Sequence, residues 1–274
     1  MTDKSDWQGQ TGENWAEEWR RTDRSFGHLT EELLARTRSF AFRRVLDIGC
    51  GAGELSLAIA RGRQEVTVTG VDVSSRLIDV AKERGRRLAN VSFTLADAAE
   101  WQGAPDEAPD LLVSRHGVMF FDNPSAAFAH LAEQSASGAG LLFSCFRTLA
   151  ENPVFTEVVR LLPEEPEPGD PHAPGPFAFA DPARVDGILA DAGWTQFAAT
   201  PFDFPMIIGA GEDPVEDAVG YFSRIGPAAR AASELDLNAR QRFFDRVRNL
   251  AERHLHGNIV ALPAAAWIVT ARKG

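Results

Sequence analysis

The amino-acid sequence predicts an α/β fold built on a mostly parallel β-sheet, and two observations lead to this prediction. Short apolar runs alternate with helical patterns through the first half of the chain, in the order expected of βαβ units. The apolar runs are continuous rather than alternating, as in strands that are covered by helices on both faces. A chain of 274 residues suits one large domain of this class that carries a modest cap.

The strands and helices are predicted in alternation along residues 41–147. Five apolar runs are predicted to be strands, at residues 43–48, 66–71, 91–95, 110–114 and 140–146. Helical patterns between them predict helices at residues 53–61, 74–84 and 124–135. Capping side chains that stand directly before a proline mark three helix starts, at Asn123-Pro124, Asp181-Pro182 and Asp213-Pro214.

The second half, residues 148–274, has a different pattern. Residues 163–176 are rich in proline and acidic residues, which predicts an exposed loop that can serve as a lid. Strands are predicted at residues 195–208 and 264–272, with a charged and mostly helical stretch at residues 212–258 between them. A helical insertion between two late strands is expected to form a cap above the sheet.

Composition restricts the classes of partner. The formal net charge of −11 repels polyanions, so neither nucleic acid nor an anionic membrane is an expected partner. The N-terminus lacks the apolar core of a signal peptide, and no apolar run approaches the roughly 20 residues that span a bilayer. A cytoplasmic location is therefore expected. The two cysteines, Cys50 and Cys145, lie in apolar runs and are too few for a thiolate metal cage, so no metal is expected.

The sharpest motif is VLDIGCGAG at residues 45–53. Gly49, Gly51 and Gly53 follow a predicted strand and open a helix, where a tight turn needs residues without a Cβ. Such a turn lets the main chain approach a ligand and presents the unpaired N–H groups of a helix N-terminus. The spacing is neither the G-x-G-x-x-G of dinucleotide-binding loops nor a phosphate-binding loop.

Two acidic residues follow the next two strands. Asp72 closes the second strand, where a carboxylate can accept hydrogen bonds from both hydroxyls of a ribose; capping the following helix is its alternative role. Asp97 lies just past the third strand, where it can accept from an exocyclic adenine amine while the Ala98 backbone contacts the edge of the ring. The alternative for Asp97 is an ordinary loop residue.

These motifs, followed by DLLVSRHGVMFFDNP and GAGLLFSCFR, resemble those of class I S-adenosylmethionine (SAM)-dependent methyltransferases, nearest to the ubiquinone/menaquinone-type branch that methylates small molecules. The resemblance implies a Rossmann-like sheet of seven strands, the last antiparallel. It assigns Asp47, Gly49 and Gly51 to the methionine end of SAM, with Ser114 beside them, and leaves Arg76 or Leu77 to cover the adenine ring. The full set of expected cofactor-binding residues is Trp15, Asp47, Gly49, Cys50, Gly51, Asp72, Val73, Leu77, Asp97, Ala98, Ser114 and Arg115.

His116 is the candidate catalytic base. It follows the fourth strand, at the sheet edge where open α/β sheets bind ligands, and histidine titrates near working pH. Its alternative is packing without chemistry. Arg115 is a candidate for holding the methionine carboxylate or an acidic substrate, or else it has a structural role.

The N-terminal segment, residues 1–40, is predicted to be helical. Trp15 and Trp19 are four residues apart and are expected to share a helix face, packed either on the core or over the SAM pocket, where an aromatic ring attracts the sulfonium. An apolar or aromatic acceptor is expected if the aromatic and apolar residues of the second half line the pocket rather than the core, namely Phe177, Phe179, Met206, Tyr221 and Phe222.

The predicted function is methyl transfer to a small molecule, with S-adenosylhomocysteine (SAH) as the product of the cofactor. Two alternatives stay open: a SAM-binding regulator without turnover, and an NAD(P)-dependent oxidoreductase, against which the glycine spacing argues. The chain is treated as a single domain, and a homodimer is compatible with the sequence.

Overall fold

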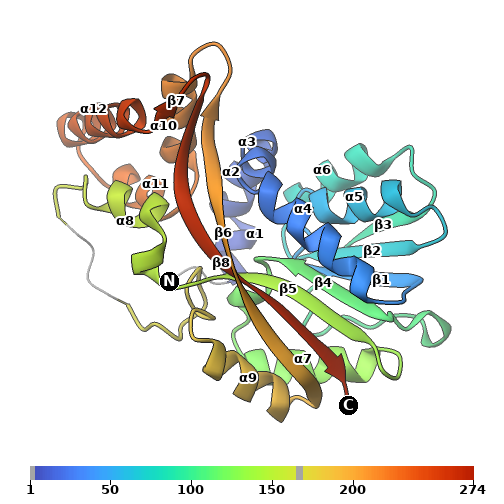
Figure 1. Cartoon of the computed structure of the whole chain (residues 1–274). Helices are drawn as coiled ribbons and strands as arrows, with labels where there is room; N and C mark the ends of the chain where they lie inside the picture. Colours follow the sequence, from blue (N-terminus) through green and yellow to red (C-terminus); the bar gives the residue numbers. More distant parts are fainter. Residues whose placement is uncertain (1–3, 165–168) are drawn as a thin grey trace.

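The computed structural model describes residues 4–164 and 169–274. A mixed β-sheet lies at its centre, with the strand order β3-β2-β1-β4-β5-β8-β6 and the short β7 paired to β8 (Figure 1). The strands are β1 (Arg44–Ile48), β2 (Thr67–Asp72), β3 (Val91–Leu95), β4 (Leu111–Arg115), β5 (Gly140–Phe146), β6 (Trp194–Ala210), β7 (Leu255–His256) and β8 (Ile259–Lys273). The first five strands run parallel, whereas β8 is antiparallel to both β5 and β6. The predicted fold class is confirmed.

Helices cover both faces of the parallel part of the sheet. On one face lie α4 (Gly27–Arg36), α5 (Glu54–Gly62) and α6 (Ser75–Gly85), and on the other lie α7 (Pro124–Gln134) and α9 (Pro182–Asp191) (Figure 1). The predicted proline-marked caps are present: Asn123 accepts from the Ala126 N–H, and Asp181 from the Ala183 N–H. The central strands β4 and β5 are almost wholly buried, which explains why their sequences are continuously apolar.

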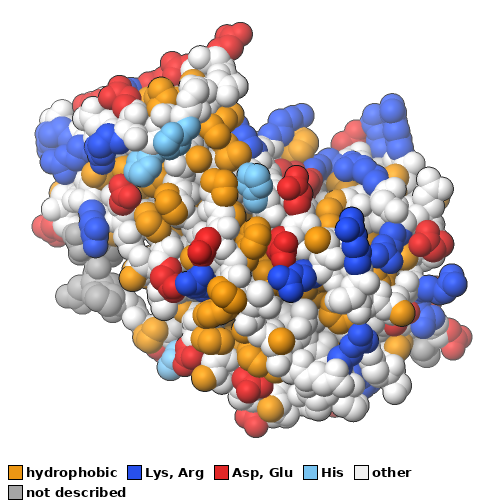
Figure 2. Space-filling view, in the orientation of Figure 1, with side chains coloured by type: hydrophobic (Ala, Val, Ile, Leu, Met, Phe, Trp, Pro, Cys, Tyr) orange, Lys and Arg blue, Asp and Glu red, His pale blue; other side chains and the backbone are white. Residues whose placement is uncertain are grey.

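The strands β6 and β8 are much longer than the others, with 17 and 15 residues against five in β1. At about 3.3 Å per residue, a strand of that length projects far beyond the five-residue strands of the core. The projecting ends form a two-stranded ribbon that carries the cap (Figure 1). Its outer face bears hydrophobic side chains between basic groups over α12 and over the α4–α6 end (Figure 2), while α3 and α10 pack on β6.

The cap lies where the sequence predicts it, between β6 and β8, and is divided into three helices. They are α10 (Pro214–Arg224), α11 (Pro227–Ser233) and α12 (Leu237–Arg253). Gly226, at φ +87°, separates the first two, and the Asp236 side chain caps the third by accepting from the Ala239 N–H. The helix α8 (Pro153–Val159) was not predicted. Of the predicted loop at residues 163–176, residues 165–168 lie outside the described residues.

The N-terminal segment forms the helices α1 (Lys4–Gln8), α2 (Gln10–Glu17), α3 (Trp19–Ser25) and α4. The expectation that Trp15 and Trp19 share a helix face is wrong, because the chain leaves helical geometry at Glu18 and a new helix begins. Trp15 lines the central cavity, whereas Trp19 lies between the guanidinium groups of Arg20 and Arg84. The bend allows one short segment to cover two separate surfaces.

Ion pairs attach the N-terminal helices to both halves of the molecule. Asp23 of α3 pairs with Arg84 of α6 at 2.6 Å, on the side of the core. Arg21 and Arg24 of the same helix both pair with Asp217 of the cap, at 2.8 and 2.6 Å. The segment therefore bridges the core and the cap. Within the described residues, no helix combines the length and apolarity needed to cross a membrane.

Candidate functional site

A single large cavity opens at the carboxyl ends of the parallel strands. It lies where the strand order reverses between β1 and β4, which is the position at which open α/β sheets bind ligands. Its volume is about 2050 Å³. Pockets for one drug-sized ligand occupy roughly 300–1,000 Å³, so this cavity has room for two molecules side by side.

The glycine loop after β1 forms one wall, and each of its glycines has a separate physical reason. Gly49 is at φ +62°, and a Cβ there would lie 2.8 Å from the Cα of Gly117, so the loops after β1 and β4 touch through their main chains. Gly51 is at φ +54°, with no heavy atom within 4 Å of a Cβ position, on the cavity wall. Gly53 is at φ +85°, and a Cβ would clash with Phe93 at 2.8 Å. The loop is thus fixed on two sides and open toward the cavity.

The carboxylate of Asp72 is held at the end of β2 by two main-chain donors. The Gly51 N–H donates to Oδ2 at 2.8 Å, and the Ser74 N–H donates to Oδ1 at 2.9 Å. Burial raises the pKa of Asp72, while these N–H groups act in the opposite direction. Each oxygen keeps a lone pair that can accept one further bond. The ribose role and the local structural role are therefore compatible.

Asp97 lies next along the same edge, after β3. Its Oδ1 accepts from the Ala99 N–H at 2.9 Å, and its Oδ2 pairs with Lys4 of α1 at 2.6 Å. Ala98 lines the cavity beside it. A residue of the N-terminal segment thus closes over the position assigned to the adenine amine, and sequence reasoning missed Lys4 because 93 residues separate it from Asp97. The predicted Val73 and Leu77 also line the cavity, whereas Arg76 lies outside it, in a groove along α6.

Asp47 is a buried carboxylate at the floor of the site, 1% exposed. Burial raises its pKa to about 7, although the Ser56 hydroxyl donates to it at 2.5 Å and Arg115 also favours the charged form. A cation placed nearby would shift the proton off this group. The site therefore contains a carboxylate whose charge depends on what is bound.

Three further predicted residues surround the loop. Cys50 and Arg115 line the cavity, and the Arg115 guanidinium donates to Thr30 at 2.8 Å and lies 3.6 Å from Asp23. Ser114 is not among the lining residues. Its hydroxyl donates to the Ile48 carbonyl at 2.7 Å and accepts from the Gly117 N–H at 3.0 Å, so it joins the β1 and β4 loops.

His116 carries two unfavourable features at once. It has φ +63°, which is unusual for a residue with a side chain, and its Nε2 is buried without a hydrogen-bond partner in the described part of the chain. Each feature typically costs about 1–3 kcal/mol. Burial lowers the pKa of His116 to about 3, the main-chain hydrogen bond with Ser144 opposes this, and Arg115 adds to it. The residue lines the cavity as a neutral imidazole.

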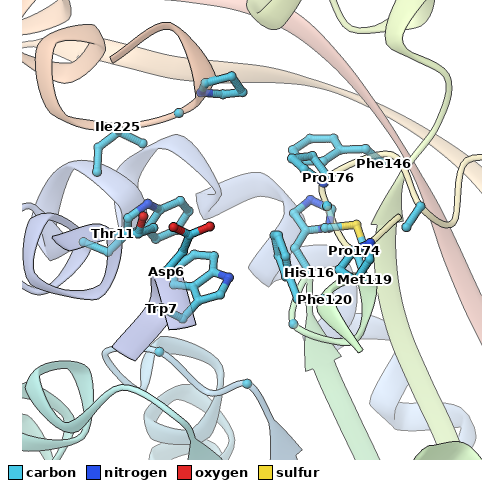
Figure 3. Close-up of a pocket in the computed structure, with 18 of the residues that line it drawn as sticks. Asp6, Trp7, Thr11, His116, Met119, Phe120, Phe146, Pro174, Pro176 and Ile225 are labelled. Atoms are coloured by element: carbon cyan, nitrogen blue, oxygen red, sulfur yellow. The ribbon is translucent and has the colours of Figure 1, made fainter. Parts of the chain in front are cut away.

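A continuous series of aromatic rings forms the wall opposite the glycine loop. Trp7 contacts Trp15 at 5.2 Å between centroids, Trp15 stacks on Phe26 at 6.4 Å, and Phe26 meets His116 at 5.3 Å. We call these rings, together with the next three, the ring wall; the series continues through Phe146, Phe155 and Phe177. Figure 3 shows Trp7 on the N-terminal side and His116 and Phe146 on the other side of the same space.

The predicted acceptor residues of the second half divide between cavity and core. Phe177, Met206, Tyr221 and Phe222 line the cavity. Phe179 does not, because it is 1% exposed and packs against other buried rings of the core. Residues 169–176 of the predicted loop also contribute to the lining, and Ile225 enters from the cap (Figure 3). Sequence reasoning missed Trp7, Phe26, Phe146 and Phe155, since an isolated aromatic residue in an apolar run gives no signal beyond burial.

Metal chemistry finds no support in the arrangement of side chains. Among the described residues, no group of three or more His, Cys, Asp or Glu side chains is placed to hold a metal ion. Cys50 and Cys145 are both buried and unpaired with each other. His254 lies near Glu157 at 3.3 Å, remote from the cavity lining.

Comparison with known proteins agrees with this geometry. Residues 45–138 match a protein-family model described as "Methyltransferase domain". A trans-aconitate 2-methyltransferase of Methylobacterium radiotolerans is 32% identical over 164 residues, which cover 59% of this chain and 61% of that protein. A malonyl-[acyl-carrier protein] O-methyltransferase of Paenibacillus sp. is 30% identical over 130 residues, covering 45% of this chain and 47% of the relative. The chain thus spans less than two thirds of the length of these relatives.

A solved structure extends the comparison to nearly the whole fold. It is a Haemonchus contortus phosphoethanolamine N-methyltransferase 2 in complex with phosphomonomethylethanolamine and SAH, with a TM-score of 0.55 and 18% identity, covering 95% of this chain and 56% of that one. These comparisons support a SAM-dependent methyltransferase and SAM as its cofactor. No relative named here is of the ubiquinone/menaquinone type, so that branch stays a prediction.

Proposed function

We propose that this chain is a SAM-dependent methyltransferase that acts on a small, apolar or aromatic metabolite. One arrangement carries the proposal: the glycine loop is open toward the cavity at Gly51, and its N–H holds the Asp72 carboxylate at the tip of the next strand. A backbone cradle beside a fixed carboxylate fits an adenosyl group, whose sugar presents two adjacent hydroxyls. The cavity of about 2050 Å³ leaves further space for an acceptor.

The residues that fit the cofactor divide by the part they would hold. Asp72 would accept from the ribose, Asp97 and the Ala98 backbone would bind the adenine edge, and Val73 and Leu77 would pack on its ring. At the methionine end we place Asp47, Gly49, Cys50, Gly51 and Arg115, with Trp15 near the sulfonium and Ser114 holding the two loops together. When bound, SAM supplies a methyl group that its sulfonium has already activated.

The protein would then act mainly by positioning. Methyl transfer needs the acceptor atom in line with the bond that breaks and about 3 Å from the methyl carbon. His116, the last wall residue before the glycine loop, lies where the acceptor would meet the methyl group. The ring wall would exclude water and hold a flat or apolar body.

The acceptor residues lie mostly outside the segment shared with the family. Residues 45–138 match the family model, whereas Phe146, Phe155, Phe177 and the cap residues follow it. The named substrates of the relatives therefore do not transfer directly to this chain. The predicted domain boundaries, cytoplasmic location and homodimer likewise stay predictions.

Two measurements test the proposal together. SAM or SAH should raise the melting temperature, and NAD should not, since only a ligand of the folded state stabilises it. Label from methyl-tritiated SAM should then appear in a small-molecule product when apolar acceptors are added. Stabilisation by NAD instead would indicate an oxidoreductase, and SAM binding without transfer to any acceptor would indicate a regulator without turnover.

A further inference from the structure

The chemistry of the acceptor side can be read from the groups around His116. Its Nδ1 lies 3.3 Å from the Ser144 hydroxyl, and its ring stacks on Phe146 at 4.1 Å between centroids. Phe26 covers it edge-on, and the nearby charged group is the Arg115 guanidinium. No carboxylate contacts either ring nitrogen in the described part of the chain. The surroundings thus favour a neutral imidazole and offer nothing to stabilise an imidazolium.

This arrangement disfavours the proton removal for which His116 was first considered. A histidine base becomes positively charged when it takes a proton, and such bases are ordinarily stabilised by a carboxylate on the far nitrogen. Here that position holds a serine hydroxyl. When Ser144 donates to Nδ1, the proton of the neutral ring lies on Nε2, which becomes an N–H donor. That atom has no partner in the described structure and lies in the ring wall.

The cations of the cavity are already engaged. Lys4 pairs with Asp97, Arg115 lies near Asp23, and Arg224 pairs with Glu17. Arg230 pairs with Asp6 at 2.6 Å, and the exposed Arg240 lies over the Phe244 ring. Among the described lining residues, the acceptor side therefore has no buried cation set aside for a polycarboxylate. Its unpaired buried groups are the N–H donors of Trp7 and His116.

We propose that the acceptor is an apolar monocarboxylic acid, and that His116, oriented by Ser144, is an N–H donor to its carboxylate rather than a base. This inference rests on the proposed function. The carboxylate oxygen uses a lone pair to form the O–CH3 bond as the S–CH3 bond breaks and sulfur keeps the bonding pair. The products are a methyl ester and SAH, and no proton is transferred.

The apolar wall suits this reaction better than methylation of a neutral hydroxyl. A carboxylate and a sulfonium neutralise each other as the methyl group moves, so a water-poor, low-dielectric pocket favours the transition state over the separated charges. A hydroxyl would instead leave its proton in the pocket as a new charge. A small rotation of the imidazole, or of the rings of Phe26 and Phe146 that cover it, brings Nε2 into contact with a bound oxygen.

A matched pair of probes tests the acceptor class. 2-Naphthoate and 2-naphthol share one ring system and differ in the acidic group; cinnamate and decanoate extend the acid series, and trans-aconitate is the polyacid control. Calorimetry with the SAH-loaded protein should show binding of the apolar acids, at least tenfold tighter for 2-naphthoate than for 2-naphthol. With tritiated SAM, the label should enter a base-labile ester, which releases volatile methanol at high pH.

Two variants test the role of His116. H116Q keeps an N–H donor near the position of Nε2 but is no base, whereas H116F keeps the ring and has neither function. We expect H116Q to bind 2-naphthoate within about threefold of the unaltered chain and H116F to bind it at least tenfold more weakly. S144A should fall between them, because the tautomer is then no longer set.

Four results would overturn the proposal. They are base-stable label transferred to 2-naphthol, preference for trans-aconitate, H116Q as impaired as H116F with turnover that rises along a titration, and failure of all three apolar acids to bind. Each is judged in protein shown by calorimetry to bind SAH. Loss of SAH binding itself would instead refute the proposed function.

Discussion

The glycine-loop region and the acceptor side of the same cavity are built on opposite principles. Around β1 and β2, recognition rests on main-chain geometry and one carboxylate: Gly49 and Gly51 in left-handed conformation, and Asp72 held by an N–H of the loop. Across the cavity, the wall consists of side chains from the N-terminal helices, the β4 and β5 ends, α8 and the loop before α9. The first design requires particular residues at fixed spacing, whereas the second requires only apolar volume. A donor site of the first kind can be shared while the acceptor changes.

The largest effect is expected at the contact between the two loops. G49V should weaken SAH binding by more than about 100-fold, because φ +62° disfavours a β-branched residue and the Cβ would lie 2.8 Å from a main-chain atom of Gly117. G51A is the matched control: it meets the same backbone strain but no clash, so a loss of less than about tenfold is expected. Calorimetry measures both affinities, and thermal unfolding reports whether G49V still folds. Equal losses in the two variants would show that the clash is unimportant.

Asp72 tests the carboxylate of the same region. D72A should weaken SAH binding about tenfold or more, because a charge-assisted hydrogen bond contributes roughly 1.5–3 kcal/mol. D72N keeps the shape and one acceptor oxygen, so its affinity should lie between those of D72A and the unaltered chain. An affinity for SAH unchanged in D72A would remove the ribose assignment.

The pH dependence of SAM binding sharpens the role of Asp47. Its pKa is raised to about 7 without ligand, so part of the population is protonated at neutral pH. If the SAM ammonium lies beside it, binding favours the carboxylate, and affinity must rise with pH up to about 7 and then level off. From pH 6 to pH 8 the expected gain is about tenfold. D47N should abolish this dependence, and a profile that stays the same in D47N would assign the titration to another group.

The smallest effect is expected on the acceptor side, where several rings share the contact. F155A should raise the KM for an apolar acceptor about fivefold, through lost apolar contact, and leave the Kd of SAH within about twofold. F179A, in the core and outside the cavity lining, is the control that should lower stability without this selective effect. A change in SAH affinity in F155A as large as the change in KM would mean that the two regions are not independent.

The difference between the regions also explains what could be predicted from the sequence. The strand and helix order, the cap between β6 and β8, and the cavity position of the glycine loop, Asp72 and Asp97 followed from local patterns, because strand ends of a parallel sheet meet at one edge. The bend at Glu18, the helix α8 and the pairing of Lys4 with Asp97 did not, because they depend on contacts between distant segments. The unpaired Nε2 of His116 is likewise a property of the packed wall.

The central claim is that the open glycine loop and the carboxylate on the next strand bind an adenosyl amino acid. Calorimetric titration of the full chain with SAH, repeated in the presence of excess NAD, tests it most directly. The account predicts binding of one SAH per chain, with the same affinity when NAD is present. Absence of SAH binding, or displacement of SAH by NAD, would contradict it.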